Sequence, residues 1–129
     1  MEISNKNPFQ AFVGIQVEKV DEMGSFLSLE LQYHHFNLYD IPHGGVHSTF
    51  LDIAMGIAGS YSLDKSEKIS TITLNLNVNY LSQTKSKKIF ATGLIKKRTK
   101  RLAFCEGTVT DTNKKILSTS SGVFKLIRA

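Results

Sequence analysis

The chain has 129 residues, of which 41% are apolar and 21% charged, the size and composition of one ordinary globular domain. Cys105 is the single cysteine, which excludes an intramolecular disulfide and suits a reducing compartment. No apolar run approaches the roughly 20 residues of a membrane span, and no signal-peptide pattern opens the chain, so we expect a cytoplasmic protein.

The first part of the chain predicts a loose start and two strands. Residues 1–8 are polar and are expected to be loose, and Phe9–Phe12 can form a short helical turn. Apolar and polar residues alternate over Ile15–Val20 and more clearly over Ser25–Tyr33, which is the period of a half-buried strand. The polar stretch His34–Pro42 predicts the loop that follows.

A long helix is predicted to begin at the Gly44-Gly45 pair. Six apolar side chains beyond the pair fall within about 140° of one another at about 100° per residue: Phe50, Ile53, Ala54, Ile57, Ala58 and Tyr61. The rest of the helix surface is mostly small or polar, with Asp52 near its middle. Because a helix that is apolar or small nearly all round is usually buried, we expect Asp52 inside the molecule or at an interface.

Four strands are predicted after the helix. Residues 70–81 alternate most cleanly, and the period places five apolar side chains on one face: Ile72, Leu74, Leu76, Val78 and Tyr80. The other strands are expected at Lys88–Lys97, Leu102–Asp111 and Ile116–Ile127. The element order is then β-β-α-β-β-β-β. The fold class is α+β in a single domain over residues 1–129, with one long helix against an antiparallel sheet.

The predicted helix carries two groups that suit acyl chemistry. A Gly-Gly pair at a helix start leaves backbone N–H groups at the positive end, where they can bind a developing oxyanion. Asp52 is a carboxylate among small neighbours, eight residues beyond Gly44 and about 12 Å along the axis. One carbonyl cannot reach both groups on the same helix. A site that uses both needs a second copy of the chain, which predicts a dimer.

The run Asn37-x5-His43-Gly44-Gly45-x6-Asp52 resembles the hotdog-fold acyl-CoA thioesterases of the phenylacetate-pathway (PaaI-like) and 4-hydroxybenzoyl-CoA thioesterase type. Those enzymes carry an Asn or Gln, then HGG, then an acid nine residues after the His. Residues 76–81, 98–102 and 121–124 are also similar to the family, and the resemblance covers residues 9–127. It implies a hotdog fold, in which the sheet wraps the helix and two protomers join their sheets.

The resemblance also implies roles for the residues of the motif. Asp52 would be the general base for water or the nucleophile towards the thioester, and Gly44 N–H would polarise the carbonyl. Asn37 would contact that carbonyl or orient the water, although an Asn in a loop also suits turn chemistry. We assign His43 and Gly45 to the substrate-binding surface, with His43 fixing the loop by hydrogen bonds or, less in keeping with the family, transferring a proton.

One position departs from many relatives, which carry Ser or Thr four residues after the acid to hold the attacking water. This chain has Gly56 there, and Thr49 or Ser48 could take over that contact.

The net charge of +5 favours an anionic partner. Two basic groups contribute, one at Lys85, Lys87 and Lys88, and one at Lys96, Lys97, Arg98, Lys100 and Arg101. The second group is predicted to bind the phosphates of coenzyme A, with solvated turns as the alternative for both. Nucleic acid is not favoured, because the basic residues are not interleaved with aromatic ones.

No metal or separate cofactor is predicted. His34, His35 and His47 lack the spacing of a known metal motif, and neither GxSxG nor GxGxxG occurs. Coenzyme A is expected only as part of the substrate.

The sequence therefore predicts an acyl-CoA thioesterase that acts as a homodimer or as a dimer of dimers. One alternative is a hotdog enoyl-CoA hydratase or dehydratase, but those enzymes need a catalytic His and none follows the helix. The other is a module that binds or senses acyl-CoA without hydrolysing it.

Overall fold

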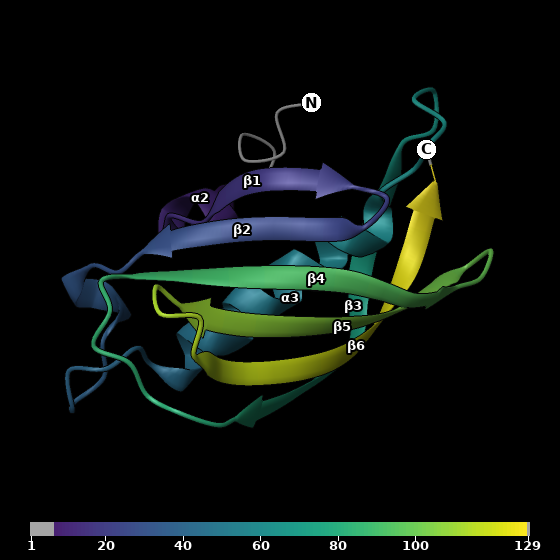
Figure 1. The fold of residues 1–129 in the computed structure, drawn as a ribbon. Helices are drawn as coiled ribbons and strands as arrows, with labels where there is room; N and C mark the ends of the chain where they lie inside the picture. Colours follow the sequence, from purple (N-terminus) through teal and green to yellow (C-terminus); the bar gives the residue numbers. More distant parts are fainter. Residues whose placement is uncertain (1–6, 129) are drawn as a thin grey trace.

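The computed structural model describes residues 7–128, which form one antiparallel sheet around one long helix (Figure 1). The six strands lie in the order β1-β2-β4-β5-β6-β3. Their bounds are β1 Gln16–Asp21, β2 Gly24–Glu30, β3 Ile69–Tyr80, β4 Lys88–Arg98, β5 Leu102–Asp111 and β6 Ile116–Arg128. The helices are α2 Pro8–Val13, the 3-10 turn η1 Tyr33–His35 and α3 Gly44–Ser60. The predicted element order and the α+β class are confirmed.

The first helix begins earlier than predicted. Asn7 caps α2 by accepting a hydrogen bond from the Gln10 N–H at 3.0 Å, and Pro8 fills the first helical position, where its missing N–H costs nothing. Gly14 ends the helix with φ +96°, a conformation that glycine adopts without strain. Residues 7 and 8 are therefore ordered, contrary to the predicted loose start, and residues 1–6 lie outside the described part.

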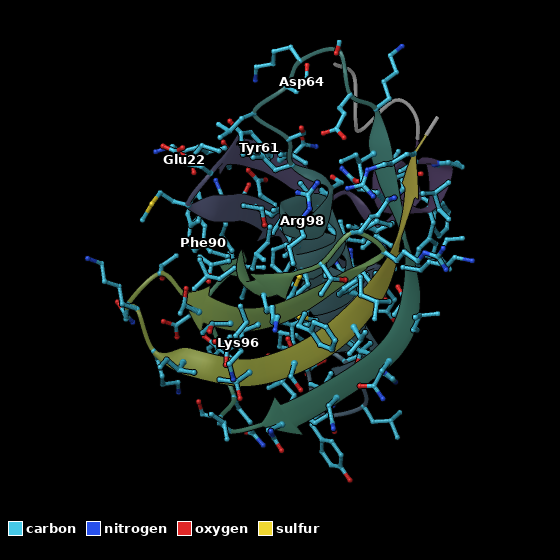
Figure 2. The ribbon with its side chains drawn as sticks, turned by 90° about the vertical axis from the view of Figure 1, so that its right-hand side faces the viewer. Glu22, Tyr61, Asp64, Phe90, Lys96 and Arg98 are labelled. Atoms are coloured by element: carbon cyan, nitrogen blue, oxygen red, sulfur yellow. The ribbon has the colours of Figure 1, made fainter. Side chains whose placement is uncertain are left out.

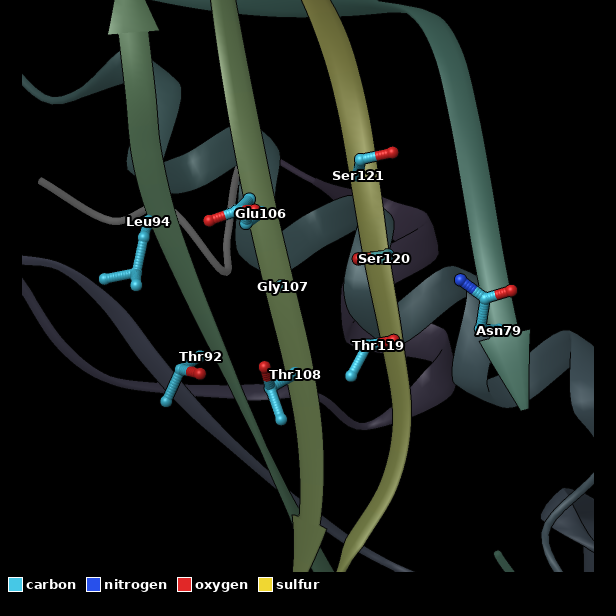
Figure 3. A pocket seen from close by; sticks show the side chains of 9 residues that line it. All are labelled: Asn79, Thr92, Leu94, Glu106, Gly107, Thr108, Thr119, Ser120 and Ser121. Carbon is cyan, nitrogen blue, oxygen red and sulfur yellow. The ribbon is translucent and has the colours of Figure 1, made fainter. Parts of the chain in front are cut away.

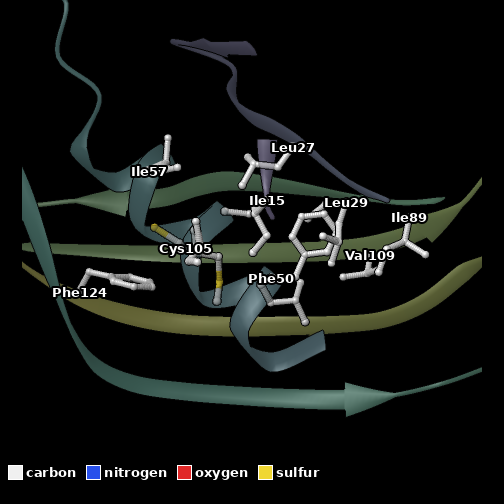
Figure 4. Packing of buried hydrophobic residues seen from close by; sticks show 14 of the residues in the cluster. Ile15, Leu27, Leu29, Phe50, Ile57, Ile89, Cys105, Val109 and Phe124 are labelled. Carbon is white, nitrogen blue, oxygen red and sulfur yellow. The ribbon is translucent and has the colours of Figure 1, made fainter. Parts of the chain in front are cut away.

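Helix α3 lies in the concave face of the sheet, as the view along the helix shows (Figure 2). The central residues of α3 are buried as predicted. Side chains of the helix and of the sheet form one core (Figure 4): Ile15, Leu27, Leu29, Phe50, Leu51, Ala54, Met55, Ile57, Ile89, Val109, Leu117 and Phe124. Burial of each large apolar side chain stabilises the fold by about 1.5–3 kcal/mol. The core therefore fixes the position of α3, and with it every group that the helix carries.

Strand β4 approaches the middle of α3 very closely. A Cβ atom at Gly93 would lie 2.3 Å from the carbonyl oxygen of Ala54, so this contact requires glycine. The Ser25 hydroxyl donates to that same oxygen at 2.6 Å.

Among residues 7–128 no helix is long and apolar enough to cross a membrane.

Strand β2 ends before the predicted boundary at Tyr33. The chain turns into η1 because the Gln32 N–H donates to Nδ1 of His35 at 2.9 Å, while Nε2 of His35 lies 2.7 Å from the Val13 carbonyl oxygen. These bonds link the end of β2 to α2. They need a partner far along the chain, which alternation cannot reveal.

A β-bulge in β3 overturns the predicted single apolar face of residues 70–81. Thr73 lies opposite Phe124 of β6, but Asn75 lies opposite Val123, so Leu74 is the extra residue. Since Phe124 is buried against α3, Thr73 faces the helix. The side chains of Ile72 and Leu74 are 54% and 57% exposed.

Beyond the bulge the predicted apolar face does point to the helix. Leu76, Val78 and Tyr80 lie opposite Gly122, Ser120 and Ser118, and the two serines are buried. The bulge therefore shifts the alternation by one residue. It turns a pair of threonines inward along the first half of β3 and apolar residues inward along the second.

Candidate active site

The start of α3 leaves one backbone donor open. His43 caps the helix, and its Nδ1 accepts the Gly45 N–H at 2.8 Å. The carbonyl oxygen of His43 accepts the N–H groups of Val46 and His47, at 2.9 and 3.3 Å. Among residues 7–128 the Gly44 N–H has no acceptor, so it is the free donor at the positive end of the helix. His43 and Gly45, both predicted to bind substrate, flank Gly44 in the chain and are hydrogen-bonded to each other.

The end of β3 is tied to the same place. The Tyr80 hydroxyl donates to the carbonyl oxygen of Gly44 at 3.1 Å and lies 2.6 Å from Oγ of Ser48. A Cβ atom at Gly44 would lie 3.5 Å from the Tyr80 ring, an ordinary contact. Tyr80 thus holds the Gly44–Gly45 peptide, which directly follows the open N–H. Sequence reasoning missed this role, because no local pattern links residues 36 positions apart.

A buried histidine lies beneath this contact. Nδ1 of His47 is 2.7 Å from Oγ of Ser118, and the His47 ring meets the Tyr80 ring edge-on at 5.7 Å between centroids. Burial lowers the pKa of His47. Burial also lowers the pKa of His35, with the Val13 carbonyl opposing it and His34 adding to it. Within residues 7–128 no three metal-binding side chains gather, and both buried histidines are hydrogen-bonded elsewhere.

Asn37 lies in the loop that leads into α3. Its Oδ1 accepts the N–H groups of Tyr39 at 2.8 Å and Ile41 at 3.4 Å, while Asp40 takes φ +59°. The oxygen end of the amide therefore holds the turn. The nitrogen end of the amide, which is a donor, has no acceptor among residues 7–128.

Asp52 lies two turns further along α3 and is half-buried. Its Oδ1 accepts the hydroxyl of Thr73 at 2.6 Å, and among the described residues Oδ2 has no donor. Sequence reasoning placed Thr73 on the opposite face of β3, so it missed this contact. A bulge is a property of strand pairing, and alternation gave no signal for it.

The second basic group is divided by the fold. Lys96, Lys97, Lys100 and Arg101 are exposed on the hairpin between β4 and β5, and Lys96 pairs with Glu106 at 3.6 Å. Arg98 instead donates to the carbonyl oxygen of Tyr61, just beyond the last turn of α3 (Figure 2). Within one chain this hairpin lies at the end of α3 opposite to Gly44. The structure therefore separates the predicted phosphate-binding residues from the predicted carbonyl-binding donor of the same chain.

Comparison with known proteins decides the family. The model of the thioesterase superfamily matches residues 39–117, which include α3 with Asp52 and the strands β3, β4 and β5. The chain belongs to the thioesterase superfamily. A Sulfurisphaera tokodaii protein named "Putative esterase" is 25% identical over 126 residues, which cover 98% of this chain and 92% of the relative. Family membership supports the hydrolysis of thioesters.

Solved structures confirm the hotdog fold. A thioesterase family protein from Silicibacter pomeroyi has a TM-score of 0.86 at 17% identity, with 98% of this chain and 93% of that chain covered. A thioesterase from Haemophilus influenzae has a TM-score of 0.83 at 17% identity, with 98% and 91% covered. The resemblance inferred from the HGG motif is confirmed at the level of family and fold.

The structure explains why this thioesterase-superfamily chain has glycine at position 56, four residues after Asp52, where many relatives have a hydroxyl side chain. A Cβ atom at Gly56 would lie 3.0 Å from Oγ1 of Thr71, whose hydroxyl donates to the Gly56 carbonyl oxygen at 3.2 Å. A side chain at position 56 thus has little room. Thr49 is half-buried one turn before Asp52, on the same side of α3. That its hydroxyl holds the attacking water stays a prediction.

The outer face of the sheet holds a shallow depression of about 370 Å³ (Figure 3). Three threonines in register across β4, β5 and β6 line it, Thr92, Thr108 and Thr119, together with Leu94 and Glu106. Helix α3 lies on the other side of the sheet, and no predicted site residue lines the depression. The carboxylate in its lining, that of Glu106, pairs with Lys96 at 3.6 Å, and the depression lies on the other side of the sheet from the Gly44 N–H, so it does not suit thioester hydrolysis.

Proposed function

We propose that this protein hydrolyses acyl-CoA thioesters to the free acid and coenzyme A, at sites formed between two copies of the chain. The observation that carries the proposal is the pairing on one rigid helix of an open N–H at Gly44 and a carboxylate at Asp52. An N–H at the positive end of a helix stabilises the oxyanion that forms when a thioester carbonyl is attacked. A carboxylate supplies the base or the nucleophile.

The two groups are too far apart to act together within one chain. They are eight residues apart on α3, about 12 Å along the axis. The Gly44 N–H of one protomer, with the Asn37 amide nearby, would therefore hold the carbonyl oxygen, while Asp52 of the partner subunit faces the carbonyl carbon. Asp52 would take a proton from water, or attack the carbon and be released by water. In both routes the C–S bond breaks and the coenzyme A thiolate leaves.

The long edge of the sheet supports this dimer. Strand β3 has 12 residues, and in the described part of the chain it pairs only with β6 and leaves its other edge unpaired. It also carries exposed apolar side chains, with Ile72, Leu74 and Tyr80 between 54% and 57% exposed. Long apolar edges of this kind invite pairing with another strand. A two-fold dimer with paired β3 strands would run its two α3 helices in opposite directions, bringing the start of one towards the middle of the other.

The same dimer would bring the basic hairpin of one protomer nearer to the Gly44 donor of the other, because the hairpin lies at the opposite end of α3. Lys97, Lys100 and Arg101 are exposed there and would bind the phosphates of coenzyme A. The substrate would then lie along the seam between the subunits. No separate metal or cofactor takes part in the proposed reaction.

The deciding experiment measures free-thiol release from a panel of aromatic, short-chain and medium-chain acyl-CoAs. We expect turnover by the wild type on at least one of them and a loss of about a thousandfold or more in the Asp52→Ala variant, as for a base or nucleophile essential to the reaction. Asp64→Ala is the matched control. Asp64 is an exposed carboxylate in the connector after α3, bonded to Ser66, and its removal should leave turnover unchanged.

Two results would contradict the proposal. A folded Asp52→Ala protein with wild-type turnover would remove Asp52 from the reaction. Acyl-CoA binding by the wild type without turnover on any thioester would favour the binding or sensing module instead.

A further inference from the structure

We propose that Thr73 is a positioning residue for Asp52, and that its hydroxyl holds Oδ1 so that Oδ2 is the oxygen that meets water or the thioester. This inference rests on the proposed function and adds a residue to the same site.

The contact itself has one possible direction. An ionised carboxylate can only accept hydrogen bonds, and a threonine hydroxyl has a single proton. The 2.6 Å separation between Oγ1 of Thr73 and Oδ1 of Asp52 therefore commits that proton to Asp52. The distance lies in the range of short, charge-assisted O–H···O⁻ bonds, which are stronger than neutral ones. One carboxylate oxygen is thus occupied, and the other has no donor among residues 7–128.

The bulge at Leu74 is what aims Thr73 at Asp52. Thr73 lies opposite the buried Phe124 and so faces α3, whereas regular alternation with the apolar residues beyond Leu74 would turn it away. Bulges often re-aim a side chain beside an active site. Leu74 itself is 57% exposed in the protomer, so the bulge does not serve to pack Leu74 against α3.

A second threonine shows that the bulge serves more than packing. Thr71 faces α3 from the same strand, two residues earlier, and its hydroxyl donates to the carbonyl oxygen of Gly56 at 3.2 Å. Both threonines therefore tie β3 to α3, one turn of helix apart. Only the Thr73 bond ends on a group that can react. The same kind of hydrogen bond is therefore structural at Thr71, and we assign it a positioning role at Thr73.

Rigidity gives the positioning role its physical effect. A β-branched side chain has few χ1 states, so Thr73 offers its hydroxyl in a narrow range of directions. The last torsion of an Asp side chain is otherwise broad and two-fold. Fixing that torsion keeps Oδ2 aligned, and misplacing a catalytic group by about 1 Å can cost about a hundredfold in rate. Thr73 should therefore act on kcat and leave substrate binding almost unchanged.

The test compares three variants in the thiol-release assay. Thr73→Val keeps the branched shape and removes the hydroxyl, and we expect kcat to fall about tenfold to a hundredfold with KM changed less than about twofold. Thr73→Ser keeps the hydroxyl and should recover most of kcat. Thr71→Val is the matched control, because it removes the same group from the same face of β3, and kcat should stay at the wild-type value.

A second measurement does not depend on turnover. If the two side chains are coupled, Thr73→Val should lower the Tm of the wild type but should not lower that of Asp52→Ala further. Wild-type kcat in Thr73→Val, or equal losses in Thr73→Val and Thr71→Val that follow a loss of Tm, would overturn the positioning role. A wild type without turnover would overturn the proposed function and this role together, and the Tm cycle would then show the contact to be structural only.

Discussion

The two ends of helix α3 are finished in opposite ways. At the start, His43 and its side chain satisfy three of the first four N–H groups and leave that of Gly44 open. At the other end, the Arg98 guanidinium covers the carbonyl of Tyr61, and the Ser60 hydroxyl donates to the carbonyl of Ile57 at 2.8 Å. The negative end is neutralised within the chain, whereas the Gly44 N–H at the positive end has no acceptor among residues 7–128.

The basic residues near the end of α3 differ in the same way between a contact within the chain and exposure. Arg98 belongs to the helix end, where a cation opposes the dipole and stabilises the fold by about 0.3–1 kcal/mol. Lys97, Lys100 and Arg101 are exposed, and we propose that they bind the phosphates of coenzyme A. One basic group in the sequence is thus divided between a contact of the fold and a proposed contact with the substrate. The following predictions test the two ends, from the largest expected effect to the smallest.

Gly44→Pro should remove the open donor and leave the helix intact. Proline is well accepted at the first position of a helix, and His43, at φ −62° and ψ 144°, already has the backbone that precedes a proline. We expect kcat for acyl-CoA to fall about a hundredfold to a thousandfold, as for other losses of an oxyanion donor. Gly44→Ala keeps the N–H and should retain much of the activity, while circular dichroism checks that both variants fold.

The same variant can show whether the site spans two subunits. Co-expression of Gly44→Pro with Asp52→Ala produces mixed dimers that have one complete site only if each site draws on both chains. With random assortment, activity should recover to about a quarter of the wild type. No recovery, with mixed dimers present, would contradict a site shared between protomers.

At the opposite end, reversing the charge of the hairpin should weaken substrate binding and leave the chemical step alone. For Lys97→Glu with Lys100→Glu we expect KM for acyl-CoA to rise about tenfold, equivalent to about 1.4 kcal/mol, with kcat almost unchanged. An acyl-N-acetylcysteamine thioester lacks the phosphates, and its KM should not change. Lys85→Glu with Lys87→Glu, an equal charge change on the connector before β4, is the control. An equal rise in KM there would indicate a general charge effect.

The smallest effect concerns His47 beneath the start of α3. Burial lowers the pKa of His47 in the folded protein below its ordinary value of 6.5, so the unfolded chain binds more protons as the pH falls. Its contribution to stability is therefore fully present above pH 6.5 and is lost as the pH falls below it. His47→Asn should reduce the drop in Tm between neutral and acidic pH by about 2 °C or more.

His35 contributes in the same direction, since its pKa is also lowered by burial, so some pH dependence should remain. Identical Tm profiles for the wild type and His47→Asn would contradict this assignment.

Helical period and strand alternation predicted most of the fold, because the helices and strands depend largely on residues that are neighbours in the chain. The Gly44-Gly45 pair marked the start of α3, and the helical period marked its buried face. Alternation located β5 at Leu102–Asp111 without error. Alternation failed at the end of β2 and in the middle of β3, where bonds to Val13 and pairing with β6 decide the course of the backbone.

The candidate site divides in the same way. The sequence by itself determined the family, and it predicted the donor at the start of α3 and the acid at Asp52, because each rests on residue types at short, fixed spacings. Tertiary structure alone decided that Arg98 closes the far end of α3 and that a bulge turns Thr73 towards Asp52. These contacts join residues 37 and 21 positions apart. Their geometry depends on how β3 and β4 pair and pack against the helix, which no local period encodes.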